Sequence, residues 1–382
     1  GQSSSGQIEM SELSFYIHIP YCTKRCGYCD FNTYTPSELR EGGTLENVSN
    51  GFVDSLIAEV TFAARTNSTT IPTIFFGGGT PSLMPAKDLG RVIELLKQRW
   101  QFAPDIEITM ECNPDTLTLK SLEEYRAIGI NRISMGMQSA NHKVLKILDR
   151  THNPENVELS VLNARKAGFD NVSLDLIYGT PGETLKEWES TVDQALSYDV
   201  DHLSAYALIV EDSTKLAAKI KRGEINRPDD DLMTQMYLAV DSKATSKNLN
   251  WYELSNWGKP AKHNLVYWNN QNWWGLGPGA HSHVDGVRWW NVKHPSKYQE
   301  QLAKFESPMQ ERERLTVEQQ RDEAIMLQIR LREGLRLNDL NPKQIEALQQ
   351  FQDQVEITES HATLTPAGRL IADRIVRTLV MA

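Results

Sequence analysis

Three cysteines stand close together near the start of the chain. Cys22, Cys26 and Cys29 are separated by three and then two residues, and one further cysteine occurs among the 382 residues. Thiolates are the usual ligands of iron–sulfur clusters, and a compact loop can wrap three of them around one cubane. Three ligands leave one iron of a [4Fe–4S] cluster open to bind another molecule. Zinc fits less well, because no fourth Cys or His follows at a regular spacing.

A glycine-rich turn follows the second apolar run of the chain. Residues 75–80 read Phe-Phe-Gly-Gly-Gly-Thr, and the turn includes Gly78, Gly79 and Thr80. Glycines let the backbone approach a ligand closely and leave its N–H and C=O groups unhindered. Alone, such a turn is weak evidence of function, but here it accompanies the cysteine loop.

Polar side chains lie in or just after the runs that read as strands. They are Tyr16, Glu111, Gln138, Arg150 and Asp175. A guanidinium can bind a carboxylate through two parallel hydrogen bonds, and a carboxylate can accept from neighbouring hydroxyls. Singly, each of these residues could be an ordinary surface or strand residue; together they predict a ligand site. No catalytic residue is assigned.

The segments that must position these residues alternate between short apolar runs and amphipathic stretches. A parallel strand pair needs a crossover connection, so the alternation predicts an α/β fold that closes as a partial (β/α)₆ barrel, with chemistry at the C-terminal rim. The predicted strands are Phe15–Ile19, Thr73–Phe76, Ile106–Met110, Arg132–Met135, Val172–Ile177 and Leu203–Leu208, and the helices Phe52–Arg65, Lys87–Trp100, Leu119–Ala127, Pro154–Ala167 and Lys186–Ser197.

The chain changes character after the predicted barrel. We expect a flexible tail at 1–12, the barrel at 13–210, a Trp/Gly-rich extension completing it at 211–311, and a smaller α+β domain at 312–382. In that last domain the order helix, helix, two strands, helix is typical of a winged-helix-like domain. The extension holds seven of the nine tryptophans, between Trp251 and Trp290.

Composition excludes several classes of protein. A net charge of −10 argues against a nucleic-acid binder, which would normally present a basic face. No run of eighteen apolar residues occurs, so no transmembrane helix is expected. The tail resembles no signal peptide. The expected location is therefore cytoplasmic, although a transit peptide removed before this point is not excluded.

The cysteine spacing resembles the signature of the radical-SAM superfamily. Membership implies that the open iron binds S-adenosylmethionine, which the reduced cluster cleaves to a 5′-deoxyadenosyl radical. By the same resemblance the glycine turn would hold the methionine amino group, Glu111 would lie near the methionine moiety, Arg150 would meet its carboxylate and Asp175 the ribose hydroxyls. Tyr16 and Gln138 complete the implied site.

Within the superfamily, the chain is most similar to the oxygen-independent coproporphyrinogen dehydrogenase group, and in it to the HemW-type haem chaperones. The dehydrogenases carry a further cysteine where this chain has Phe31. The haem chaperones carry an H-N-x-x-Y-W motif, which is matched by His263, Asn264, Tyr267 and Trp268. Imidazole is a common haem ligand and aromatic rings suit a flat macrocycle, so the resemblance implies a haem contact here.

Other roles for the haem motif stay open. His263 could instead close a loop, the tryptophans could form core, and His281 and His283 compete as haem ligands.

Two functions follow from the resemblance. The first is a haem chaperone that delivers haem to acceptors such as respiratory cytochromes, and the second is a radical decarboxylase of coproporphyrinogen III. The missing cysteine and the H-N-x-x-Y-W motif favour the first. The resemblance also implies a homodimer and, through partners, peripheral membrane contact.

Overall fold

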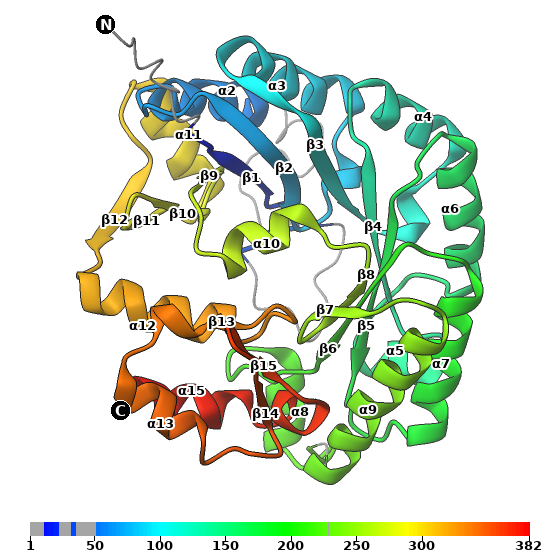
Figure 1. Cartoon of the computed structure of the whole chain (residues 1–382). Coiled ribbons are helices and arrows are strands. Elements are labelled where there is room, and N and C mark those ends of the chain that lie inside the picture. Colours follow the sequence, from blue (N-terminus) through cyan, green and yellow to red (C-terminus); the bar gives the residue numbers. More distant parts are fainter. Residues whose placement is uncertain (1–10, 23–31, 36–50, 228) are drawn as a thin grey trace, which may run out of the picture.

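The computed structural model describes residues 11–22, 32–35, 51–227 and 229–382. Its centre is a curved sheet, in which the described residues form twelve strands (Figure 1). Six of these strands are parallel and adjacent in chain order, which confirms the predicted α/β fold. They are β1 (Ser14–Ile19), β2 (Thr70–Gly78), β3 (Gln101–Cys112), β4 (Arg132–Gln138), β5 (Val172–Tyr178) and β6 (His202–Ala207).

Helices cover the outer face of the parallel strands (Figure 1). They are α2 (Phe52–Ala63), α3 (Ala86–Arg99), α4 (Leu119–Ala127), α6 (Glu155–Lys166), α7 (Leu185–Ser197) and α9 (Asp230–Ser246). Thr118 and Thr184 begin α4 and α7 with capping boxes, which satisfy N–H groups that a helix start leaves unpaired.

The two faces of the strands differ in chemistry, because successive side chains point to opposite sides. Side chains such as Ile74, Ile108 and Ile133 belong to the main apolar core beneath the outer helices. Their neighbours along the strands are polar and buried, as Thr73 and Arg132 are. The apolar core therefore lies between strands and helices, and the inside of the arc is polar.

The Trp/Gly-rich segment adds strands to both edges of the parallel sheet. On one side β9 (Trp273–Leu276) pairs in parallel with β1, and β10 (His281–Val284), β11 (Val287–Asn291) and β12 (Met309–Arg314) follow it. On the other, β8 (Asn256–Gly258) and β7 (Trp251–Glu253) extend β6 in antiparallel pairing.

The helix α10 (Lys262–Trp268) connects the two edges and lies inside the arc of strands (Figure 1). The domain limits at 210, 311 and 312 stay predictions.

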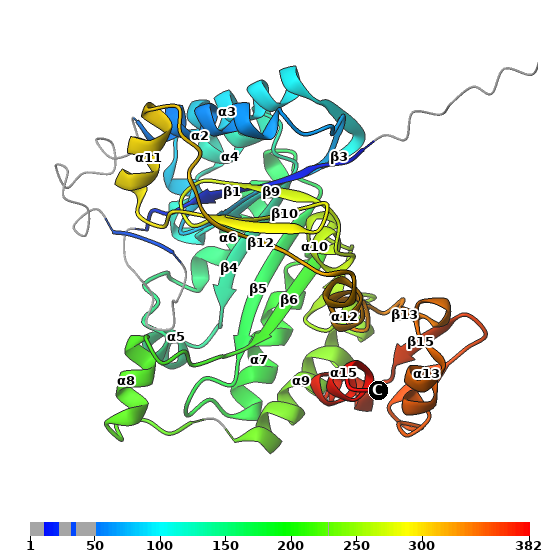
Figure 2. The same cartoon turned by 90° about the vertical axis from the view of Figure 1, so that its left-hand side faces the viewer.

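The last part of the chain has a buried cluster of its own, which includes Ile329, Leu348 and Ile375. Figure 2 shows α13, β13 and β15 projecting beside the barrel. The elements are α12 (Val317–Gln328), β13 (Leu335–Arg336), α13 (Pro342–Leu348), β14 (Val355–Ile357), β15 (His361–Leu364), α14 (Pro366–Arg369) and α15 (Ala372–Val380). The expected last helix is thus two helices, because Ile371 is non-helical. The winged-helix likeness stays a prediction.

Short elements complete the described chain. They are α5 (His142–Ile147), α8 (Lys215–Lys221), α11 (Pro295–Ala303) and the 3₁₀ turns η2 (Pro81–Leu83), η3 (Pro114–Thr116) and η4 (Leu337–Asp339). Within the described ranges, no helix combines the length and the apolar character needed to cross a membrane.

Candidate functional site

The first predicted cluster ligand lies against the glycine turn. Cys22 follows β1 at the end of the strand, its side chain is buried, and its N–H donates to Tyr34 O at 3.0 Å. The N–H of Thr80 donates to Tyr21 O at 2.8 Å. A Cβ on Gly79 would overlap the Tyr21 carbonyl oxygen and lie 2.8 Å from Cys22 Sγ. The turn therefore holds this part of the cysteine loop, which only a glycine at position 79 allows.

The other two predicted ligands, Cys26 and Cys29, lie outside the described residues, as does Phe31. In the part of the chain that is described, no group of three or more His, Cys, Asp or Glu side chains is placed to hold a metal ion. The fourth cysteine, Cys112, is buried, and its Sγ lies 3.6 Å from Met110 O.

Glu111 lies inside the arc, beside the ring of Tyr16. A Cβ on Gly77 would lie 3.0 Å from the Tyr16 ring and 3.3 Å from Glu111 Oε1, so both side chains occupy the space over this glycine. Burial raises the pKa of Glu111 to about 8, and the nearby Asp175 carboxylate adds to the effect. The backbone of Gly78 donates to Glu111 and opposes that rise.

Asp175 lies two strands from Glu111 and faces the same interior. Its carboxylate accepts from Ser134 Oγ at 3.3 and 3.4 Å. Burial raises the pKa of Asp175, while Arg132 opposes the shift. The Arg132 side chain is buried, and its Nε has no hydrogen-bond partner among the described residues. Two partly buried carboxyl groups thus share the interior with the buried guanidinium of Arg132.

Gln138 and Arg150 converge over Gly136. A Cβ on Gly136 would lie 3.0 Å from Gln138 Nε2 and 3.3 Å from Arg150 Nη2. Arg150 Nη2 donates to Gly136 O at 2.9 Å, and its Nε donates to His152 Nδ1 at 3.2 Å. Gln138 adopts a φ of 63° and its Oε1 is buried without a hydrogen-bond partner in the described chain.

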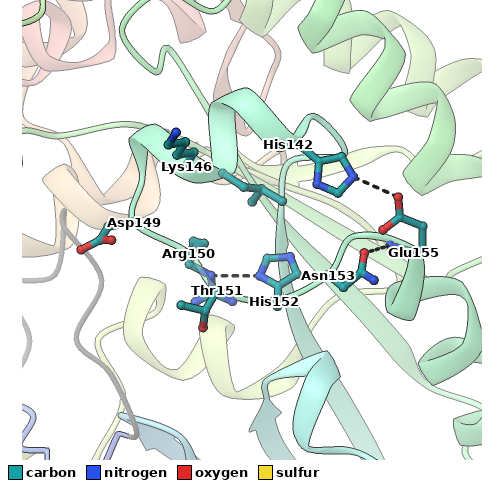
Figure 3. A pocket seen from close by; sticks show the side chains of 9 residues that line it. His142, Lys146, Asp149, Arg150, Thr151, His152, Asn153 and Glu155 are labelled. Atoms are coloured by element: carbon teal, nitrogen blue, oxygen red, sulfur yellow. Dashed lines mark hydrogen bonds and ion pairs between the residues drawn. The ribbon is translucent and has the colours of Figure 1, made fainter.

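Arg150 also lines a surface pocket of about 670 Å³. Figure 3 shows Arg150 beside His152, and also the contact between His142 and Glu155, whose Nε2 and Oε1 lie 3.0 Å apart. Burial lowers the pKa of His152 to about 4, and the charge of Arg150 adds to the effect, so His152 is neutral at physiological pH. The other lining residues are Leu145, Lys146, Asp149, Thr151 and Asn153.

His263 lies at the opposite end of the strands from the glycine turn. Its ring is buried, with Nδ1 2.7 Å from Thr73 Oγ1 and Nε2 2.6 Å from Tyr267 Oη. Burial lowers its pKa to about 3. Glu107 accepts from the N–H groups that begin α10, at 2.9 Å for Lys262 and 3.2 Å for His263. Both ring nitrogens are therefore engaged, and haem ligation by His263 would require one of these bonds to break.

Stacked rings join this helix to the predicted S-adenosylmethionine site. The His263 ring stacks on Phe75 with centroids 5.1 Å apart, and Phe75 stacks on Tyr16 at 6.1 Å. Tyr267 meets Trp273 edge-on at 4.8 Å. Ring contacts thus connect the H-N-x-x-Y-W motif to the side chains inside the barrel.

The other motif residues are less deeply buried. Asn264 Nδ2 lies 3.5 Å from Tyr252 Oη, and the Arg330 guanidinium lies 5.9 Å from the Trp268 ring. His281 and His283, the other candidate haem ligands, differ in exposure. His283 is buried and its Nδ1 lies 3.1 Å from Gln271 O, whereas His281 is exposed and stacks on Trp290.

Sequence reasoning missed the buried residues behind the site. Arg132 begins its strand and looked like a boundary residue, and Glu107 carried no motif. His18 bridges Tyr16 Oη at 2.9 Å and Asn32 O at 2.7 Å. The Gly-rich segment after α10 packs here too, because Asn32 Nδ2 donates to Pro278 O at 3.1 Å. The alternation of polar side chains along the strands was a signal that pointed to this interior.

Comparison with known proteins assigns the chain to a family. The family model described as "Radical SAM superfamily" matches residues 16–195. "Heme chaperone HemW" of Mycobacterium tuberculosis is 41% identical over 96% of this chain and 94% of the relative. The chain belongs to the HemW family of the radical SAM superfamily. A second HemW-family protein, "Heme chaperone HemW" of Bacillus subtilis, is 32% identical over 95% of this chain and 97% of its own length.

A solved structure shares the fold of this HemW-family chain. The structure described as coproporphyrinogen III oxidase (HemN) from Escherichia coli, a radical SAM enzyme, superposes with a TM-score of 0.81. It covers 97% of this chain and 90% of that chain at 22% identity. That likeness shows the fold, a radical SAM partial barrel, while the function rests on other grounds.

Proposed function

We propose that this chain is a haem chaperone that binds a [4Fe–4S] cluster, S-adenosylmethionine and haem, and delivers haem to acceptor proteins such as respiratory haemoproteins. Two relatives that match nearly the whole chain carry the name "Heme chaperone HemW". The cluster would be bound by Cys22, Cys26 and Cys29.

The proposal rests on a set of side chains that face the inside of the barrel from the strands β1 to β5. Glu111 and Asp175 contribute two partly buried carboxyl groups, against one buried guanidinium at Arg132. An interior with surplus carboxyl groups suits a cationic ligand, and S-adenosylmethionine carries a sulfonium and an amino group. The buried Gln138 Oε1 and Arg132 Nε have no partners among the described residues, so they are available for such a ligand.

Each remaining residue has a distinct task in this proposal. Gly78 and Gly79 bring the backbone close to the cysteine loop, Arg150 pairs with the ligand carboxylate, and Asp175 accepts from the ribose hydroxyls. Tyr16 and Thr80 line the same proposed S-adenosylmethionine site. When bound, the cluster supplies an iron with an open coordination position and the electron that radical chemistry requires.

The haem region is proposed at α10 and the neighbouring turn. Tyr267 packs on Trp273, whose Nε1 donates to His281 O at 3.2 Å, so the exposed His281 lies next to the motif. Trp268 is partly exposed on the same helix. His281 is the accessible imidazole, whereas His263 is held by Thr73 and Tyr267.

Anaerobic reconstitution with iron and sulfide, followed by haem titration, tests the proposal. We expect the wild type to take up a cluster and to bind haem with a Soret band that stays unchanged in time. His281→Ala and His263→Ala identify the ligand, and Thr73→Val serves as the matched control. Thr73→Val removes the hydroxyl bonded to His263 Nδ1 while it leaves the imidazole in place.

These three variants distinguish the loss of a haem ligand from a change in packing around His263. A band shift in His281→Ala alone assigns the ligand to His281. A shift in His263→Ala that Thr73→Val does not share assigns it to His263. If no haem binds, and if coproporphyrinogen III instead loses carbon dioxide while S-adenosylmethionine is cleaved, the chaperone proposal is wrong.

The identity of the acceptor, the homodimer, peripheral membrane contact and the cytoplasmic location stay predictions.

A further inference from the structure

A second pocket, of about 320 Å³, lies where the C-terminal elements meet the β7 edge of the barrel. Four of its nine lining residues are arginines, and Asp373 is the acidic residue among them. That concentration of positive charge stands out in a chain with a net charge of −10. The lining residues are Leu254, Arg330, Arg369, Leu370, Ile371, Ala372, Asp373, Arg374 and Arg377.

Two of the arginines are already paired with carboxylates, Arg369 with Asp241 behind the pocket and Arg330 with Asp373 on its wall. Arg369 is 8% exposed, bonds both Asp241 carboxylate oxygens at 2.8 and 3.2 Å, and stacks over Trp251 at 4.2 Å. Its Nε is buried without a partner in the described part of the chain. Arg330 Nη2 lies 2.6 Å from Asp373 Oδ1.

The other two arginines have no such restraint. Arg374 and Arg377 are exposed on α15, and among the described residues neither lies within 4.0 Å of a carboxylate oxygen. Arg374 only stacks near Phe351, with 5.8 Å between guanidinium and ring. Because α15 also begins here without a capping side chain, its N-terminal turn adds positive partial charge to the same pocket.

Apolar side chains line and flank the pocket. Leu254 and Ile371 form part of its wall, and Leu370, which also lines it, is 39% exposed. Met326 on α12, which ends just before Arg330, is 38% exposed. An isolated inorganic anion makes no use of such a surface, whereas a polypeptide that carries both carboxylate and apolar side chains does.

We propose that this arginine pocket docks an acidic, partly apolar segment of a partner protein, with its carboxylates paired to Arg374 and Arg377. Guanidinium groups bind carboxylates through two parallel hydrogen bonds, and arginine is enriched among residues that dominate protein interfaces. The proposal goes beyond haem binding and needs neither haem nor a cluster.

The test measures fluorescence anisotropy of a fluorescein-labelled peptide, Leu-Glu-Glu-Leu-Glu-Glu, with the full chain. A peptide with Gln in place of every Glu is the matched probe. The double variant Arg374→Gln/Arg377→Gln should weaken binding of the acidic peptide about tenfold or more. The control Arg312→Gln/Arg314→Gln removes the same charge from exposed positions on β12 and should leave binding unchanged.

A charge exchange makes the result independent of folding defects. Arg374→Glu/Arg377→Glu should lose the acidic peptide and gain affinity for the same peptide with Lys in place of Glu. Equal binding of the Gln peptide, or no effect of the pocket variants, overturns the proposal. So does inorganic phosphate that displaces the peptide fully at equal concentration, and so does pocket-dependent binding to phosphatidylserine vesicles in place of the peptide.

Discussion

Single side chains inside the barrel give the interior its charge balance. Glu111 and Asp175 are two partly buried carboxyl groups, and desolvation raises the pKa of both. Arg132 is the buried cation that opposes both shifts. The folded interior therefore favours the protonated form of Glu111 at neutral pH, and the pH dependence of stability measures this preference.

Replacing Glu111 by Gln should make stability less dependent on pH. The folded-state pKa of Glu111, about 8, lies above its ordinary value of 4.5, so the folded chain holds this proton more tightly. The stability it contributes is present below pH 4.5 and is lost as pH rises through about 8. Glu111→Gln should thus gain melting temperature relative to the wild type between pH 5.5 and pH 8.5, on the order of a few degrees.

Glu124→Gln is the control, because Glu124 is exposed on α4. The measurement is the Tm of cluster-free protein by scanning fluorimetry. If the difference between Glu111→Gln and the wild type is the same at both pH values, Glu111 is not the titrating group.

Elements meet at this site through contacts that tolerate no added atom. Gly79 lies between the end of β2 and the start of the cysteine loop, and its N–H donates to Ile19 O at 2.7 Å. A methyl group there would overlap the Tyr21 carbonyl oxygen and crowd Cys22 Sγ. An added methyl group would therefore push the glycine turn and the start of the cysteine loop apart.

Gly79→Ala should therefore displace Cys22 and lower the iron and sulfide bound per chain after reconstitution several-fold. Gly223→Ala is a control for backbone strain without a clash, since its φ of 75° disfavours a side chain while the added methyl group meets no atom within 4 Å. Cluster content in Gly79→Ala equal to that of the control would show that the turn does not position the loop.

A buried carboxyl group joins α2 to the strands added beyond β1. Glu59 accepts from Tyr298 Oη at 2.6 Å, Gly277 N at 2.9 Å, Trp274 Nε1 at 3.1 Å and Asn291 Nδ2 at 3.1 Å. Four donors from β9, β11, α11 and a loop thus converge on one side chain.

Glu59→Gln should lower the free energy of unfolding by about 2–4 kcal/mol, because an amide turns one acceptor into a donor that faces other donors. Chemical denaturation measures this loss. Asp54→Asn on the same helix breaks an exposed pair with Arg91 and should cost less than about 1 kcal/mol. Equal losses in the two variants would contradict the buried role of Glu59.

Across the whole molecule, the C-terminal elements are attached to the barrel by a buried ion pair. Asp241 on α9 binds the Arg369 guanidinium and accepts from Trp257 Nε1 at 3.0 Å. The Asp241 side chain is 17% exposed and that of Arg369 is 4% exposed. Little water screens this pair.

Asp241→Asn should destabilise the chain by about 2–4 kcal/mol, because it leaves the buried Arg369 charge uncompensated. Calorimetry should show a lower Tm. The control Asp193→Asn removes an exposed carboxylate that pairs with Lys243. A Tm shift in Asp241→Asn no larger than in this control would exclude the ion pair as the attachment.

The regular elements of the barrel could be predicted because their signals are local. Short apolar runs marked β1 to β6 and amphipathic stretches marked α2, α3, α4, α6 and α7, and α4 was predicted with the bounds that the structure has. The six-residue α5 and the short edge strands β7 and β8 were not predicted, since so few residues carry no clear period. The split between α14 and α15 also escaped, because Ile371 has no helix-breaking signal.

The sequence by itself determined which residues stand at the strand ends, and with them the cysteine spacing, the glycine turn and the H-N-x-x-Y-W motif. Only the tertiary structure decided what surrounds them. It buries His263 between Thr73 and Tyr267, leaves His281 exposed, and sets Arg132 between two carboxyl groups. Burial, hydrogen-bond partners and charge balance depend on residues from different strands and helices, as with Thr73 and His263, which are 190 positions apart. Spacing along a chain does not encode which of these residues meet.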